Sequence, residues 1–182
     1  YQQTLAPMLQ GEYQEDLRPL MHAKVVRNGA CVFEAFALND VVVNRGATSG
    51  MVEFRNDGGG KFVSNQRADG LIVASPTGST AYALSVGGPM IYPSVACTLL
   101  IPVAPHSLAN RPIVIPENSL IEITVTDMRD ATLYFDMQDN SEVLVGDIIK
   151  ASPYPHRVKI LHPSRHNYFD TLCKKLHWNY LP

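Results

Sequence analysis

Short apolar runs rich in valine and isoleucine recur along the chain, and glycine, proline or asparagine separates most of them. Runs of about four to eight such residues between turn formers are typical of β-strands. The Asn28-Gly29 dipeptide and the segment from Asn56 to Gly60 each lie between two runs, which predicts two β-hairpins. The expected strands cover residues 21–26, 31–36, 41–43, 51–54, 61–64, 71–74, 98–101, 113–115, 120–126, 132–135, 143–150 and 157–161.

Helical patterns are few. They favour helices over residues 4–9, from about Thr80 onward, and over residues 167–176. In the last segment, apolar residues recur at i, i+3, i+4 and i+7, at Phe169, Leu172, Cys173 and Leu176. Many short strands with few helices are typical of β-sandwiches and barrels. The predicted fold class is therefore mainly β: a sandwich-like domain of many short strands with a few short helices.

Length and composition narrow the functional classes. A chain of 182 residues forms one domain or two and can bury a core without disulfides. It has no apolar run of about eighteen residues and no signal-peptide pattern at its start, so we expect no membrane partner. The net charge of −2 argues against a nucleic-acid partner, because such surfaces concentrate Lys and Arg. Three cysteines without a CxxC pair predict reduced thiols, no zinc or redox motif, and a cytoplasmic location.

The most informative segment follows the apolar run at residues 71–74. It reads Pro76-Thr77-Gly78-Ser79-Thr80 and then becomes helical. Thr80 is a good N-cap, and the unpaired N–H groups after it would suit a phosphate. On these residues alone, a capped strand-to-helix turn that binds nothing is an equally good interpretation. The segment matches neither the P-loop nor the GxSxG nucleophile elbow.

Other polar residues interrupt the apolar runs. Asn39-Asp40 precedes Val41 and could bind ribose hydroxyls, but from these residues alone an Asx turn is the favoured interpretation. Arg67 and Asp69 share one face of an extended segment, which also fits an exposed ion pair. Gln138 follows a strand and offers both a donor and an acceptor.

Two further constellations are weak. His106 could form a hydrolytic triad with Asp69 and Ser79 or Ser85, but residue types alone do not define a triad. His162 and His166 are four residues apart, but Pro163 between them argues against a helical zinc pair.

Several of these stretches occur together, in order, in one family. They are Ala37-Leu38-Asn39-Asp40, Arg67-Ala68-Asp69-Gly70, Ser75 to Tyr82 with Ser85 and Gly87-Gly88-Pro89, Pro105-His106-Ser107-Leu108 with Arg111-Pro112, and Tyr168-Phe169 through Leu176 and Trp178. The chain thereby resembles the bacterial NAD kinases from about Leu5 onward. The PTGSTAY core with its flanks is the specific part of the match.

The resemblance implies an activity and an architecture. Members of the family transfer the terminal phosphate of ATP, or of polyphosphate, to the 2′-hydroxyl of the adenosine ribose of NAD. They join an N-terminal α/β domain to a C-terminal β-rich domain. By this resemblance, residues 1–12 are a linker or part of the N-terminal domain, residues 13–160 are the NAD-binding domain, and residues 161–182 are a tail with a helix. A homodimer or homotetramer is also implied, because NAD contacts in the family can cross a subunit interface.

The resemblance also implies the site. Asn39 and Asp40 would hold the nicotinamide-side ribose, and the residues from Thr80 onward, with Asp69, would contact the adenine and its ribose or phosphates. The implied NAD-binding set is Asn39, Asp40, Arg67, Asp69, Thr80, Ala81, Tyr82, Ala83, Leu84, Ser85 and Gln138. Mg²⁺ or another divalent cation is expected to accompany ATP, and it is not expected to be held by these residues.

The chain departs from the family at defined points. The GGDG motif, which carries the family's general base, is absent, and Asp57-Gly58-Gly59-Gly60 is a hairpin turn instead. Asp40 stands where Glu is usual, and Ala68 where Gly is usual. We therefore expect no catalytic residue in this chain. The alternatives are a non-catalytic nucleotide-binding module, a related lipid kinase, or a serine hydrolase.

Overall fold

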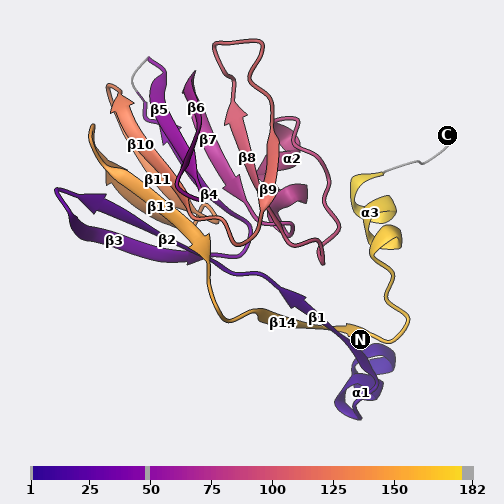
Figure 1. Ribbon diagram of the computed structural model, residues 1–182. Coiled ribbons are helices and arrows are strands. Elements are labelled where there is room, and N and C mark those ends of the chain that lie inside the picture. The colour runs from indigo at the N-terminus through magenta and orange to yellow at the C-terminus, as the bar shows by residue number, and fades with distance from the viewer. Residues whose placement is uncertain (1, 48–49, 178–182) are drawn as a thin grey trace. The chain divides into compact units, whose positions relative to one another are not determined.

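The computed structural model describes residues 2–47 and 50–177, and these are mainly in β-strands (Figure 1). Two six-stranded sheets dominate, and all neighbouring strands within them are antiparallel. The first sheet has the order β3 (Ala30–Ala37), β2 (Met21–Arg27), β13 (Ile148–Pro153), β10 (Ile121–Asp127), β5 (Val52–Gly58) and β6 (Lys61–Ala68). The second has the order β12 (Asp139–Val143), β11 (Ala131–Phe135), β4 (Asp40–Arg45), β7 (Gly70–Ala74), β8 (Cys97–Val103) and β9 (Ile113–Pro116). The predicted fold class is confirmed.

The chain divides into two compact units. Residues 18–158 contain both large sheets, and the described parts of residues 1–17 and 159–182 form the other unit. That second unit is built from α1 (Gln2–Leu9), β1 (Tyr13–Arg18), β14 (Val158–Pro163) and α3 (Tyr168–Leu176), with β1 paired to β14. The domain boundaries expected after residues 12 and 160 stay predictions, and Trp178 lies outside the described residues.

Alternating side chains build the core between the two large sheets. Strand β10, for example, buries Ile121, Ile123 and Val125 and leaves the residues between them partly exposed. These residues pack in one cluster with apolar residues of the second sheet. On the other face of the second sheet, a smaller cluster forms beneath α2 (Tyr82–Ser85) (Figure 1). Because β7 contributes to both clusters, all five of its residues are buried.

Most strand predictions are confirmed, with differences at the ends. The strand expected over residues 143–150 is wrong, because β12 ends at Val143 and β13 begins at Ile148. Gly146 has a φ of 91° between them, and the buried Asp147 carboxylate accepts from the Leu144 N–H at 2.8 Å. A side chain that bonds nearby backbone in this way stabilises a turn in place of a strand. Strand β1 and most of β12 were not predicted, because their sequences are polar.

The Asp147 carboxylate holds this turn to β2, which neighbours β13 in the sheet but is distant in sequence. Arg27 on β2 donates to both of its oxygens, at 2.9 Å and 2.8 Å. Although burial acts in the opposite direction, the hydrogen bonds from Arg27 and from the Leu144 N–H lower the pKa of Asp147. The ion pair is therefore a structural element of the first sheet.

Replacing Asp147 with Asn should lower the free energy of unfolding by about 2–3 kcal/mol, because a buried charge-assisted pair loses one partner. Urea unfolding of the purified chain measures this. Asp57→Asn is the matched control, because Asp57 pairs with the exposed Arg55. That change should cost no more than about 0.5 kcal/mol. Equal losses in the two variants would contradict the role given to Asp147.

Candidate functional site

Three turns meet at one end of the second sheet. Residues 38–40 lead into β4, which begins at Asp40, residues 75–81 follow β7, and residues 136–138 follow β11. The antiparallel pairs Asp40–Ala74 and Phe135–Val41 put these turns side by side. We call this region the Asn39 end. It gathers Asn39, Asp40, the residues from Thr80 to Ser85, and Gln138.

The backbone of the Asn39 turn is bound on its β7 side. The Ser75 hydroxyl donates to the Leu38 carbonyl at 2.6 Å, and the Ser75 N–H donates to the Asn39 carbonyl at 2.9 Å. Gly78 lies so close that a Cβ atom there would overlap the Asn39 backbone. Only glycine fits at such a contact. The PTGST segment is therefore packed against the Asn39 turn.

The PTGST segment differs from the capped helix that was expected. It forms a single 3₁₀ turn, η1 (Gly78–Thr80), and α2 begins only at Tyr82. The N-cap position is Ala81, which makes no side-chain cap, and the Thr80 hydroxyl points back to the Thr77 carbonyl at 3.5 Å. The prediction that Thr80 is the N-cap is wrong. Thr80 is the last residue of the 3₁₀ turn, so the helix begins only after Ala81. A four-residue helix also makes a weak dipole, so the helix end alone does not argue for a phosphate site.

Ser79 has a structural role in this segment. Its fully buried hydroxyl donates to the Pro76 carbonyl at 2.7 Å and accepts from the Ile91 N–H at 3.0 Å. The hydroxyl thus joins the turn to the loop after α2, and it is not exposed for attack on a substrate.

The remaining predicted residues differ in exposure. Thr80, Ala81, Tyr82 and Leu84 are half-buried, whereas Ser85 and Gln138 are exposed. Ala83 is fully buried in the cluster beneath α2, so its side chain supports the site from below. Tyr82 packs on that same cluster, which fixes the place of its ring.

Asp40 is an unusual carboxylate. It is only 2% exposed, and no hydrogen bond to its side chain occurs within residues 2–47 and 50–177. Burial, and then the nearby Asp136 carboxylate, raise the pKa of Asp40 to about 6. A carboxylate with this pKa changes its charge close to neutral pH.

A second group of polar residues lies at the opposite end of the second sheet. Arg45, Arg67, Asp69 and His106 line a hollow of about 440 Å³ together with Gly50 and Met51. Arg45 pairs with Asp69 at 3.0 Å, and the His106 N–H donates to the Arg67 carbonyl at 2.9 Å. We call this region the Asp69 end. The sequence indicated Arg67 and Asp69 here but did not indicate Arg45.

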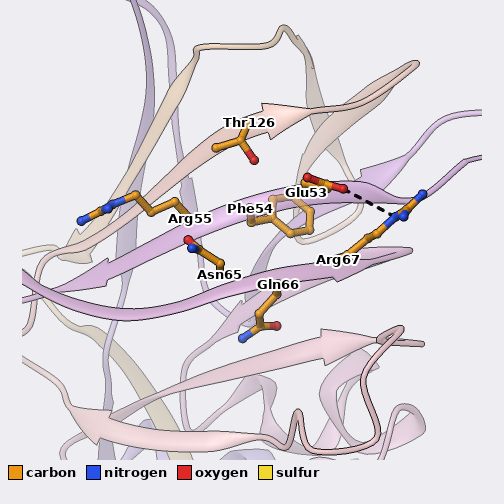
Figure 2. A pocket seen from close by; sticks show the side chains of 7 residues that line it. All are labelled: Glu53, Phe54, Arg55, Asn65, Gln66, Arg67 and Thr126. Atoms are coloured by element: carbon orange, nitrogen blue, oxygen red, sulfur yellow. Dashed lines mark ion pairs between the residues drawn. The ribbon is translucent and has the colours of Figure 1, made fainter.

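Arg67 also lines a neighbouring hollow of about 480 Å³ on β5 and β6 (Figure 2). There its Nε lies 3.7 Å from the Glu53 carboxylate across the two strands, as Figure 2 shows. Asp69 pairs with Arg45, so the ion pair suggested between Arg67 and Asp69 is not the one that forms. Exposed pairs of this kind contribute little to stability, so the Arg67 guanidinium can exchange Glu53 for an anionic ligand.

The two ends are far apart within one chain. The residues from Asp69 to Ser75 are extended, and at a rise of about 3.3 Å per residue they span about 20 Å. Arg67 and Asp69 therefore do not join Thr80, Tyr82 or Gln138 in the same chain. The hydrolytic triad is excluded for the same reason, because His106 lies at the Asp69 end and Ser79 at the other.

In the described part of the chain, no three His, Cys, Asp or Glu residues come together as a metal site. None of the described helices has the length and apolar character needed to cross a membrane.

Comparisons with known proteins agree on one family. A family model described as the ATP-NAD kinase C-terminal domain matches residues 38–162. Curated NAD kinases of Polaromonas naphthalenivorans and Delftia acidovorans are 60% and 61% identical to this chain over 179 residues. The match covers 98% of this chain but only 62% and 60% of those proteins, so the chain spans about three fifths of their length.

Solved structures show the same fold. Yeast NADH kinase complexed with NADH gives a TM-score of 0.92 at 24% identity, over 100% of this chain and 54% of that chain. An NAD kinase from Archaeoglobus fulgidus in complex with ATP gives a TM-score of 0.76 at 25% identity, over 95% of this chain and 64% of that one. The two large sheets are thus an arrangement that this chain shares with nucleotide-bound kinases.

The raised pKa of Asp40 predicts that Asp40→Asn stabilises the folded chain, by an amount that depends on pH. The folded-state pKa of about 6 lies above the ordinary value near 3.9, so ionising Asp40 destabilises the folded chain as the pH rises. The free energy of unfolding of Asp40→Asn should therefore exceed the wild-type value increasingly from pH ~4 to pH ~7, and level off above. The gain should reach roughly 3 kcal/mol.

Urea unfolding at a series of pH values measures this gain. Asp139→Asn is the control, because Asp139 is an exposed residue at the start of β12. Its effect should be small at every pH. A gain for Asp40→Asn that does not change with pH would show that the Asp40 carboxylate is not destabilised by its surroundings.

Proposed function

Because the chain belongs to the NAD kinase family, in which it is the C-terminal domain, we propose that it is the NAD-binding part of an NAD kinase. The reaction is transfer of a phosphate from ATP or polyphosphate to the 2′-hydroxyl of the adenosine ribose of NAD, giving NADP. The observation that carries this proposal is the Asn39 end. The backbone groups of its turns are hydrogen-bonded to one another, so polar and aromatic side chains remain available at the surface.

The proposed role of this domain is positioning. Phosphoryl transfer depends mainly on placing the acceptor and on stabilising charge, and holding reactants in register contributes several powers of ten in rate. Tyr82 offers a ring face for the adenine, fixed by its packing beneath α2. Thr80 and Ser85 offer hydroxyls for ribose or phosphate, and Asn39 offers an amide that can both donate and accept.

The Asp69 end enters the proposal through a second copy of the chain. Asp69 lies about 20 Å from Ser75, at the other end of β7, so Arg67 and Asp69 reach the same NAD molecule as the Asn39 end only if another subunit supplies them. This arrangement supports the homodimer or homotetramer that the sequence resemblance implies. His106 and Arg45, which line the same hollow, would then also face the nucleotide.

The general base is proposed to come from outside these 182 residues, because no GGDG motif occurs among them. Mg²⁺ is proposed to arrive with ATP and to be held by its phosphates. Asp40 and Asp136 form a pair of carboxylates at the Asn39 end. This pair does not suit the ion, because Asp136 is already bound to backbone N–H groups. The proposed location is the cytoplasm, which agrees with the three free thiols.

The 182 residues should bind NAD weakly and form no NADP with ATP or polyphosphate and Mg²⁺, because the base is missing. The natural protein that contains them should form NADP. A coupled assay with an NADP-specific dehydrogenase measures both. Turnover by the 182 residues would place the base within them, and NAD binding without turnover by the natural protein would favour a non-catalytic module. A lipid kinase would phosphorylate diacylglycerol and not NAD.

Tyr82 is the residue proposed to contact the adenine. Tyr82→Ala should weaken NAD binding to the natural protein about tenfold, because the ring supplies stacking and contact area. Isothermal titration calorimetry measures the affinity. Phe62→Ala is the control, because Phe62 is an exposed aromatic residue that contacts Arg55 on the first sheet. The assignment of Tyr82 fails if the two variants bind NAD equally well.

A further inference from the structure

One carboxylate binds the N–H side of the Asn39 turn. The Asp136 Oδ2 atom accepts from the Leu38 N–H at 2.7 Å. Its Oδ1 atom accepts from the N–H groups of Asn39 and Asp40, at 2.7 Å and 3.0 Å. In return, the Asp136 N–H donates to the Asp40 carbonyl at 3.0 Å. Hydrogen bonds to an ionised acceptor are roughly twice as strong as neutral ones, so this contact fixes the turn firmly.

The turn is consequently bound from two sides. Its carbonyls at Leu38 and Asn39 are taken by Ser75, and its N–H groups are taken by Asp136. The backbone of Asn39 therefore has no freedom to rotate. Its side-chain amide, by contrast, has no hydrogen-bond partner within residues 2–47 and 50–177. A fixed backbone that carries an uncommitted amide suits the recognition of a ligand.

This arrangement is unfavourable for the chain in two respects. Met137 has a φ of 57°, which residues other than Gly, Asn and Asp adopt rarely. The Asp136 charge also faces the buried Asp40 and contributes to the raised pKa of that residue. Strain and like-charge contacts of this kind persist where the surroundings impose them, and they concentrate at functional sites.

We propose that Asp136 is a positioning residue for NAD, which acts by holding the 38–40 turn so that the Asn39 amide faces the nucleotide. The proposal rests on the NAD-binding function proposed above. In this proposal Asp136 does not touch NAD, because three of the roughly four acceptor sites of its carboxylate already bind the turn. Its contribution therefore passes through Asn39.

The test uses Asp136→Asn in the natural protein that contains these residues. An amide offers only one acceptor oxygen and turns its NH₂ group against a backbone N–H. The KM for NAD should rise about tenfold, while kcat and the KM for ATP should change less than about threefold. A purely structural role would lower the melting temperature and the active fraction, and it would leave the KM for NAD unchanged. Asp139→Asn is the matched control and should behave as the wild type.

A double-mutant cycle identifies the route. If Asp136 acts through Asn39, then Asp136→Asn should change the KM for NAD less than about twofold in an Asn39→Ala background. Independent, additive effects would overturn the proposal. An unchanged KM for NAD in the single variant would also overturn it.

Asp136→Glu covers the case in which the Asn variant does not fold. It keeps the charge but moves the oxygens by roughly one bond, ~1.5 Å. The KM for NAD should then rise at least threefold at a near wild-type melting temperature, and an unchanged KM overturns the proposal. Failure of the proposed function looks different, because the wild type and Asp139→Asn would then form no NADP, and the inference would fall with it.

Discussion

The three N–H groups of residues 38–40 cannot all be paired by a neighbouring strand, because β4 begins only at Asp40. Left unpaired in a half-buried turn, such groups are costly. The Asp136 carboxylate accepts from all three, and Ser75 donates to the carbonyls of Leu38 and Asn39. Side chains thus replace ladder hydrogen bonds where three strands end. The position of the Asn39 side chain depends on this replacement.

The same contact explains several features that are unfavourable when viewed alone. A carboxylate at residue 136 must turn back toward β4, and the positive φ values of Asp136 and Met137 achieve this. Its charge then lies near Asp40, which is buried without a compensating donor in the described structure. Gly78 is required because the Asn39 backbone occupies the space of a side chain. Three separate local costs therefore follow from one packed turn.

The sequence was sufficient for the elements that local chemistry determines. Asn28-Gly29 and the glycine-rich segment near Gly59 do form hairpin turns, and Asn167 caps α3 by accepting from the Phe169 N–H at 3.0 Å. The sequence was insufficient where contacts between residues distant in the chain determine the local structure. Asp147 breaks the run at 143–150 with help from Arg27, which is 120 residues away in the chain. Asp136 lies two residues before the predicted site residue Gln138, yet its role depends on the Asn39 turn, 97 residues away.

The same limit applies to the grouping of site residues. Asp69 and Ser75 are close in sequence, but the strand between them is extended and buried on both faces, so it holds their ends about 20 Å apart. A strand so enclosed cannot bend to bring the ends together. Under the proposed function, a two-fold axis between two chains would bring an Asp69 end and an Asn39 end together. If the Asp69 end of one chain meets the Asn39 end of another, symmetry makes the reciprocal contact identical, and each dimer holds two complete sites. The rigidity of β7 then sets the spacing between the two nucleotides.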